Sequence, residues 1–97
     1  MKDSLRTIAS EIDFSPGQIA YSEAIPELKE DLMQVAYPDG QILDVGWYPE
    51  SNPVGKFKVL VISNGEWDTP SLDLSTQDEK QLRGLLTRAA RFIRQKY

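Results

Sequence analysis

The amino-acid sequence predicts an α+β fold, in which a four- to five-stranded, mainly antiparallel sheet carries an N-terminal helix and a long C-terminal helix packed on it. Three observations lead to this fold class: helical periodicity at both ends of the chain, hydrophobic runs of strand length between them, and turn signals separating those runs. The chain has 97 residues, of which 40% are hydrophobic and 27% charged. A chain of this size and composition suits one hydrophobic core, so residues 1–97 are expected to form a single domain.

A first helix is expected near the N-terminus, because apolar residues recur there at the i, i+3, i+4, i+7 spacing of one helix face. These residues are Leu5, Ile8, Ala9 and Ile12. Asp3 or Ser4 can cap the start of the helix, and Ser15-Pro16-Gly17 should follow its end.

Residues 18–30 are compatible with more than one structure. Gln18 to Ala24 fits either a short strand or an extended linker. Pro26 opens either one helical turn or the approach to the next strand. The sequence therefore leaves open whether the sheet has four strands or five.

The segment from Tyr37 to Gln41 predicts a tight hairpin. Its Tyr-Pro-Asp-Gly-Gln order puts Pro where a type I turn needs φ of about −65° and Gly where a bulge needs a positive φ. If Tyr37 pairs with Gln41, one side of the two strands becomes apolar and should be buried. That side carries Met33, Val35, Leu43, Val45 and Trp47. The opposite side is more mixed and should be more exposed; it carries Leu32, Gln34, Ala36, Asp44, Gly46 and Tyr48.

A second hairpin is expected after it. Phe57 to Ser63 is rich in β-branched residues, and Asn64-Gly65 is a strong signal for a two-residue turn. Trp67 to Leu74 should then be the return strand. Because Pro70 cannot donate a ladder hydrogen bond, this strand should lie at a sheet edge or bulge at the proline.

The C-terminal helix has the clearest pattern. Thr76-Gln77-Asp78-Glu79 matches a capping box, and Phe92 lies beside a long apolar stripe. The stripe consists of Leu82, Leu85, Leu86, Ala89 and Ile93. A second set, Lys80, Arg83, Arg88, Arg91 and Arg94, falls on the other side of the helix. The apolar stripe should pack on the sheet, and the basic set should face solvent.

The residue types present disfavour most enzyme chemistry. The chain has neither His nor Cys, and none of its six glycines belongs to a phosphate-binding motif. We therefore expect no catalytic residues, no cofactor and no metal. The alternative is a small enzyme using carboxylates, since Asp44, Glu50, Glu66 and Asp68 could approach one another in the fold.

Charge is distributed very unevenly along the chain. Residues 1–79 hold all fifteen acids and five of the eleven basic residues, a net charge of −10, whereas residues 80–97 hold six basic residues and no acid. The overall pI of about 4.7 disfavours nucleic acid as a partner. No apolar run approaches the roughly 18 residues of a membrane span, so a cytoplasmic protein is expected. The basic helix leaves an adaptor role as a further alternative, and the oligomeric state remains open.

Within residues 44–57, the stretch from Pro49 to Lys56 is longer than a tight hairpin needs, and long loops in compact domains are often functional. The chain contains the run Asp44-Val45-Gly46-Trp47-Tyr48-Pro49, followed by the run Gly55-Lys56-Phe57-Lys58-Val59. A later run, Trp67-Asp68-Thr69-Pro70, comes before the last helix. Together these runs resemble small bacterial immunity proteins of contact-dependent and other polymorphic toxin systems, over about residues 30 to 95. The resemblance implies a non-enzymatic cytoplasmic protein that binds and neutralises a cognate toxin.

A basic toxin or nuclease would require an acidic and aromatic binding surface. Trp47 is in phase with the buried side of its strand, so Tyr48 is the expected aromatic anchor on the other side. The expected partner-binding residues are Tyr48, Glu50, Asp44, Asp39, Glu30 and Asp31.

Overall fold

The computed structural model describes residues 8–21, 32–48 and 54–95 of the chain. Five strands form one antiparallel sheet in the order β1-β2-β3-β4-β5, so every strand pairs with its neighbours in the sequence. The elements are β1 (Gln18–Tyr21), β2 (Met33–Ala36), β3 (Ile42–Tyr48), β4 (Lys56–Ile62), β5 (Leu72–Thr76) and α2 (Glu79–Arg94). The predicted α+β class is confirmed, and the segment left open as strand or linker provides the fifth strand.

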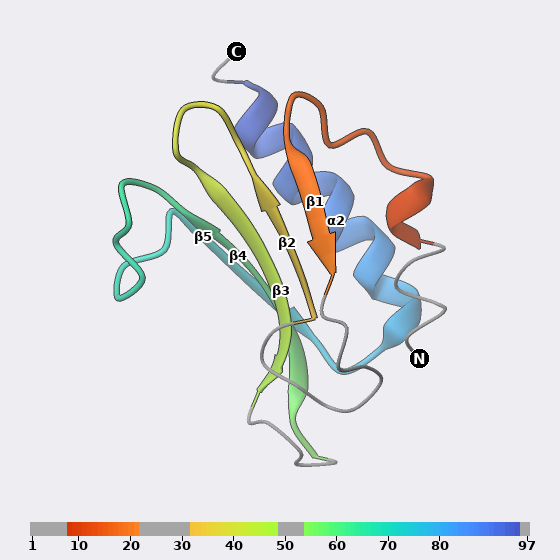
Figure 1. Cartoon of the computed structure of the whole chain (residues 1–97). Coiled ribbons are helices and arrows are strands. Elements are labelled where there is room, and N and C mark those ends of the chain that lie inside the picture. The colour runs from red at the N-terminus through yellow and green to blue at the C-terminus, as the bar shows by residue number, and fades with distance from the viewer. Residues whose placement is uncertain (1–7, 22–31, 49–53, 96–97) are drawn as a thin grey trace.

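Helix α2 lies across one face of the sheet (Figure 1). Its apolar stripe is buried as predicted, with Leu82, Leu86, Ala89 and Ile93 inaccessible to solvent and Leu85 half-buried. The predicted apolar side of β2 and β3 faces this stripe and is buried with it. The predicted basic set, Lys80, Arg83, Arg88, Arg91 and Arg94, is exposed.

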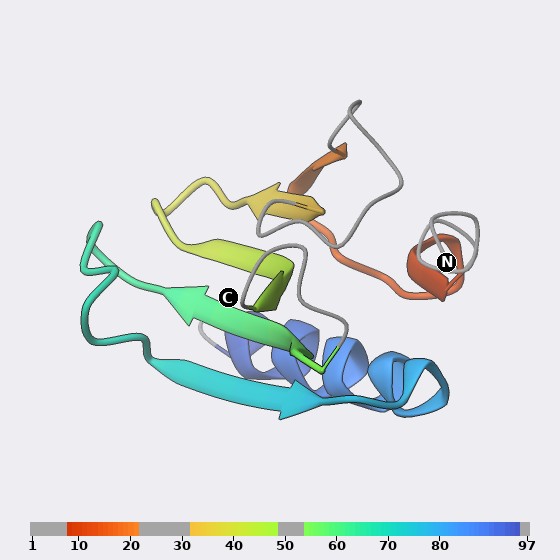
Figure 2. The same ribbon diagram turned by 90° about the horizontal axis from the view of Figure 1, so that it is seen from below.

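The N-terminal segment packs against the same core. Residues 8–10 are helical, and Ile8, Ala9 and Phe14 are buried. Arg83 of α2 forms a salt bridge with Glu11, and an Arg94 Nη donates a hydrogen bond of 2.7 Å to the carbonyl of Asp13. Figures 1 and 2 show this segment beside α2. The expected helix caps Asp3 and Ser4, Leu5 and Pro26 lie outside the described residues.

The first hairpin has the predicted register. Tyr37 donates its backbone N–H to Gln41 at 2.9 Å, and Val35 is opposite Leu43. Gly40 has a φ of +91°, the positive value that the turn requires of a glycine. The turn is therefore determined by local sequence chemistry, and it fixes which side of β2 and β3 is buried.

The second hairpin differs from the prediction. Asn64 and Gly65 do form a turn, with φ values of 59° and 71°, and Glu66 donates to the carbonyl of Ser63. The return strand, however, begins at Leu72 instead of Trp67. A further turn joins Glu66 to Thr69, and pairing resumes only where Ser71 donates to Val61. Strand β5 is an edge strand as expected, and Pro70 precedes it without having to join the ladder.

The start of α2 is also displaced from the predicted capping box. Thr76 is the last residue of β5 and is paired with Phe57, so the N-cap is Asp78, whose carboxylate accepts from the Lys80 backbone N–H at 2.8 Å. The Thr76 hydroxyl supports the turn by accepting from the Asp78 N–H at 3.0 Å and donating to Gln81 at 2.9 Å. In the described part of the chain, no helix has both the length and the apolar character needed to cross a membrane.

Candidate binding site

The expected site is centred on two adjacent rings at the end of β3. The Trp47 side chain is 7% exposed and packs edge-on against Phe57, with the ring centroids 4.9 Å apart and the planes at 85°. Tyr48 is half-buried and donates its hydroxyl to Asp44 at 3.4 Å. Because successive residues of a strand point to opposite faces, Trp47 belongs to the core and Tyr48 to the face away from α2. The predicted orientation of both rings is confirmed.

Asp44 was expected on the more exposed face of β3, but it is buried. Its side chain is 1% exposed and accepts a hydrogen bond of 2.9 Å from the Gln34 amide. Gly46 is buried on the same side, so the middle of this face is more enclosed than its composition predicted. Leu32 was also expected on this side, but it packs against the buried core cluster. Asp44 therefore cannot contact a partner directly, but it can hold the Tyr48 hydroxyl.

Asp39 lies at the opposite end of the sheet from Tyr48. It is exposed in the turn before β3, where its carboxylate accepts from the Gln41 backbone at 3.1 Å and from the Gln41 amide at 2.7 Å. The seven residues of β3 separate this turn from Tyr48, a span of about 20 Å. The two residues therefore do not form one compact site. The other expected site residues, Glu30, Asp31 and Glu50, lie outside the described residues.

The strand after the Tyr48 loop is held tightly against β3. Gly55 is buried so close to β3 that a Cβ there would lie 2.5 Å from the Tyr48 carbonyl oxygen and 2.8 Å from the Trp47 indole nitrogen. The Gln77 amide donates to the carbonyls of Gly55 at 3.2 Å and Val54 at 3.3 Å. The described end of this loop is thus fixed to both β3 and the connection into α2.

One exposed aromatic residue was missed by the strand prediction. Trp67 is 46% exposed, and it lies between the exposed carboxylates of Glu66 and Asp68 in the loop joining β4 to β5. Its acidic neighbours and the nearby Pro70 were the sequence signals for a loop at this point. We call residues 63–71 the acidic loop.

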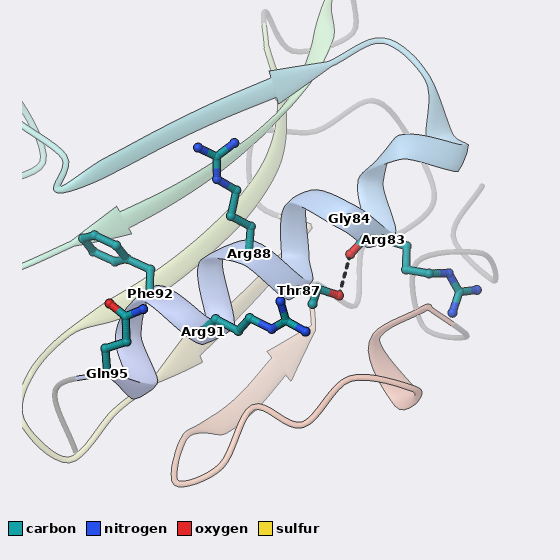
Figure 3. A pocket seen from close by; sticks show the side chains of 7 residues that line it. All are labelled: Arg83, Gly84, Thr87, Arg88, Arg91, Phe92 and Gln95. Carbon is teal, nitrogen blue, oxygen red and sulfur yellow. Dashed lines mark hydrogen bonds between the residues drawn. The ribbon is translucent and has the colours of Figure 1, made fainter.

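The outer side of α2 forms a shallow basic groove (Figure 3). The residues that line it are Arg83, Gly84, Thr87, Arg88, Arg91, Phe92 and Gln95. Arg88 and Arg91 lie on neighbouring turns of the helix (Figure 3). The Thr87 hydroxyl donates to the Arg83 carbonyl at 2.9 Å, so it is directed back to the helix. The groove combines guanidinium groups with small residues, a surface suited to an acidic ligand.

The carboxylates expected of the alternative enzyme are not assembled in the described regions. Asp44 is buried in β3, whereas Glu66 and Asp68 are exposed beyond the end of β4, and Glu50 falls outside those regions. Nor does a group of three or more metal-ligating side chains occur among the residues that the structure describes.

No protein-family model, curated protein or solved structure matches the chain. A functional proposal therefore rests on the residues and their geometry.

Proposed function

We propose that this protein is a non-catalytic protein-binding module, an acidic immunity-type inhibitor that binds and neutralises a basic toxin or nuclease in the cytoplasm. The observation that carries the proposal is the placement of Tyr48. The ring is half-buried at the end of β3, and its hydroxyl donates to a buried carboxylate. Aromatic anchors that are ordered before binding lose little conformational entropy when a partner covers them.

Charge supports a basic partner. The chain outside residues 80–97 carries a net charge of −10, and the exposed basic residues of α2 lie on the opposite side of the sheet from Tyr48. A basic cleft that has to bind nucleic acid would be attracted to this net negative charge and would associate faster at low ionic strength.

The test begins with affinity capture from the native host and mass spectrometry to identify the partner, followed by calorimetry with purified proteins. We expect Tyr48→Ala to weaken binding by about 2 kcal/mol or more, which is roughly thirtyfold in the dissociation constant. Tyr48→Phe keeps the ring and should lose less affinity.

Val54→Ala is the matched control, because Val54 is 75% exposed near the same end of the sheet but carries no ring. It should bind as the wild type does. Recovery of a small-molecule ligand only, or a Tyr48→Ala variant with unchanged affinity, would contradict the proposal.

A further inference from the structure

The basic groove contains two arginines that the fold does not use. Arg83 is paired with Glu11 and Arg94 with Asp13, which ties the N-terminal segment to α2. No described residue forms a salt bridge with Arg88 or Arg91, although both are exposed on the groove. Two unpaired guanidinium groups on adjacent turns provide a positive site that is available to a second molecule.

The groove has room for more than a bound ion. Its volume is about 600 Å³, and an added Cβ at Gly84 would meet no atom within 4 Å. Because the groove is shallow and open, a large side chain could lie across it without being enclosed. An acidic segment carrying an aromatic ring would match both its charge and its size.

The acidic loop of the same chain has this chemistry. It presents Trp67 between two carboxylates, and its conformation is fixed by the Asn64-Gly65 turn and by a 2.7 Å hydrogen bond between the hydroxyls of Ser63 and Ser71. A large ring exposed on an ordered loop loses little entropy on docking. The carboxylates can pair with arginines while a guanidinium stacks on the indole.

We propose that the acidic loop of one copy docks in the basic groove of a second copy, with Glu66 and Asp68 facing Arg88 and Arg91 and with Trp67 covering the groove. A second copy fits better than a nucleic acid or an anionic membrane, because an extended polyanion would also meet the net charge of −10 on the rest of the chain.

The position of the two surfaces allows the contact to be reciprocal. Strand β5 leads away from the acidic loop, and α2 then runs back toward the end of the sheet that carries this loop (Figures 1 and 2). Since loop and groove lie toward one end, a two-fold axis can place each loop on the other copy's groove and close the assembly as a dimer. Tyr48 is not part of this contact, so the inference does not depend on the proposed function.

Sedimentation equilibrium of the full chain over a wide concentration range tests the proposal. At low ionic strength, the mass should rise from monomer to dimer with concentration. In about 1 M salt, where the screening length falls to about 3 Å, the dissociation constant should rise at least tenfold. Trp67→Ala should also raise it about tenfold or more, whereas Val54→Ala, another exposed apolar residue, should leave it unchanged.

A charge exchange identifies the two surfaces as partners. R88E/R91E and E66R/D68R should each be monomeric alone, and an equimolar mixture of the two should form a heterodimer through the restored contact. Circular dichroism melts of each variant serve to verify that it is folded.

A wild-type chain that stays monomeric at its highest concentration overturns the proposal. So does an R88E/R91E variant that is folded and dimerises as the wild type does, or a mixture of folded variants that remains monomeric.

Discussion

At the end of β3, two neighbouring rings have different environments although they are adjacent in the sequence. Trp47 packs on Phe57 in the core, and Tyr48 lies on the face away from α2 with its hydroxyl on Asp44. The alternation of a strand explains this separation, and it makes the two residues suitable for testing fold and binding independently.

Trp47→Ala should lower the free energy of unfolding by about 3 to 5 kcal/mol, because it removes a large buried ring and leaves a cavity beside Phe57. Tyr48→Ala should lower it much less, since its ring is half-buried on the other face. Thermal and urea melts of both variants provide the measurement. Equal destabilisation by the two substitutions would mean that Tyr48 is part of the core.

Gly55→Ala should destabilise the fold by about 1 to 3 kcal/mol, because the new methyl group would overlap the Tyr48 carbonyl and the Trp47 indole and force β3 and β4 apart. Gly84→Ala is the matched control on the open side of α2, where it should stabilise the helix by about 1 kcal/mol. Urea denaturation gives both changes. A neutral Gly55→Ala would show that the strands can relax around the methyl group.

Residue-level predictions succeeded where alternation alone decides the environment, as for Trp47 and Tyr48. They failed for Asp44, since the burial of a residue on the face away from α2 depends on what the rest of the chain places over it. Asp39 and Tyr48 were chosen for one site because of their residue types. The distance between them is set by the length of β3, which separates them, and residue type carries no information about it.

At the scale of elements, the hairpin at residues 37–41 was predictable because its turn is specified by Pro and Gly within five residues. The acidic loop was only half predictable, since the Asn64-Gly65 turn forms but the start of β5 depends on pairing with β4. The cap of α2 moved from Thr76 to Asp78 for a related reason: Thr76 is still engaged in the sheet. Boundaries set by tertiary pairing are the part that local patterns miss.

The stability of the fold should depend on pH through Asp13. Hydrogen bonds from the Ser15 side chain and backbone N–H, helped by Arg94, hold the pKa of Asp13 below its usual value of 3.8. A carboxyl whose pKa is lower in the folded state than in the unfolded state stabilises the fold at pH values above its unfolded-state pKa. This stabilisation is lost as the pH falls through the folded-state pKa. Asp13→Asn should therefore melt below the wild type at neutral pH, and the gap should close at about pH 2.

Asp68→Asn controls for this comparison, because it removes the same charge from an exposed loop. At a protein concentration where the chain is monomeric, its melting temperature should differ little from that of the wild type at neutral pH. A gap between wild type and Asp13→Asn that is the same at both pH values would show that the charge of Asp13 does not stabilise the fold.

At the scale of the whole molecule, the sheet depends on α2 for one complete layer of its core. The side chains of Val35, Leu43, Val45, Val59 and Val61 are all fully buried in the cluster that α2 covers. An uncovered sheet would expose this apolar face to water, and two layers are the minimum for a stable core.

Truncation after Leu74 should therefore abolish cooperative unfolding, which circular dichroism melts would detect as loss of the transition. Reversal of charge at Arg88 and Arg91 is the corresponding control, since both residues are exposed, and at a protein concentration where the chain is monomeric it should change the stability by no more than about 0.5 kcal/mol. A cooperative melt of the truncated chain would mean that the sheet buries its apolar face without α2.

The order of the strands also has a kinetic consequence. Because each strand pairs with the next one along the chain, the sheet can form by successive hairpin closures, each joining nearby residues, and a protein of this kind should fold quickly for one rich in strands. The contact between Arg94 and Asp13 is different, since it joins residues 81 positions apart. If this contact forms after the rate-limiting step, its loss should leave the folding rate nearly unchanged and speed unfolding, so that the two ends of the chain set how long the native state persists.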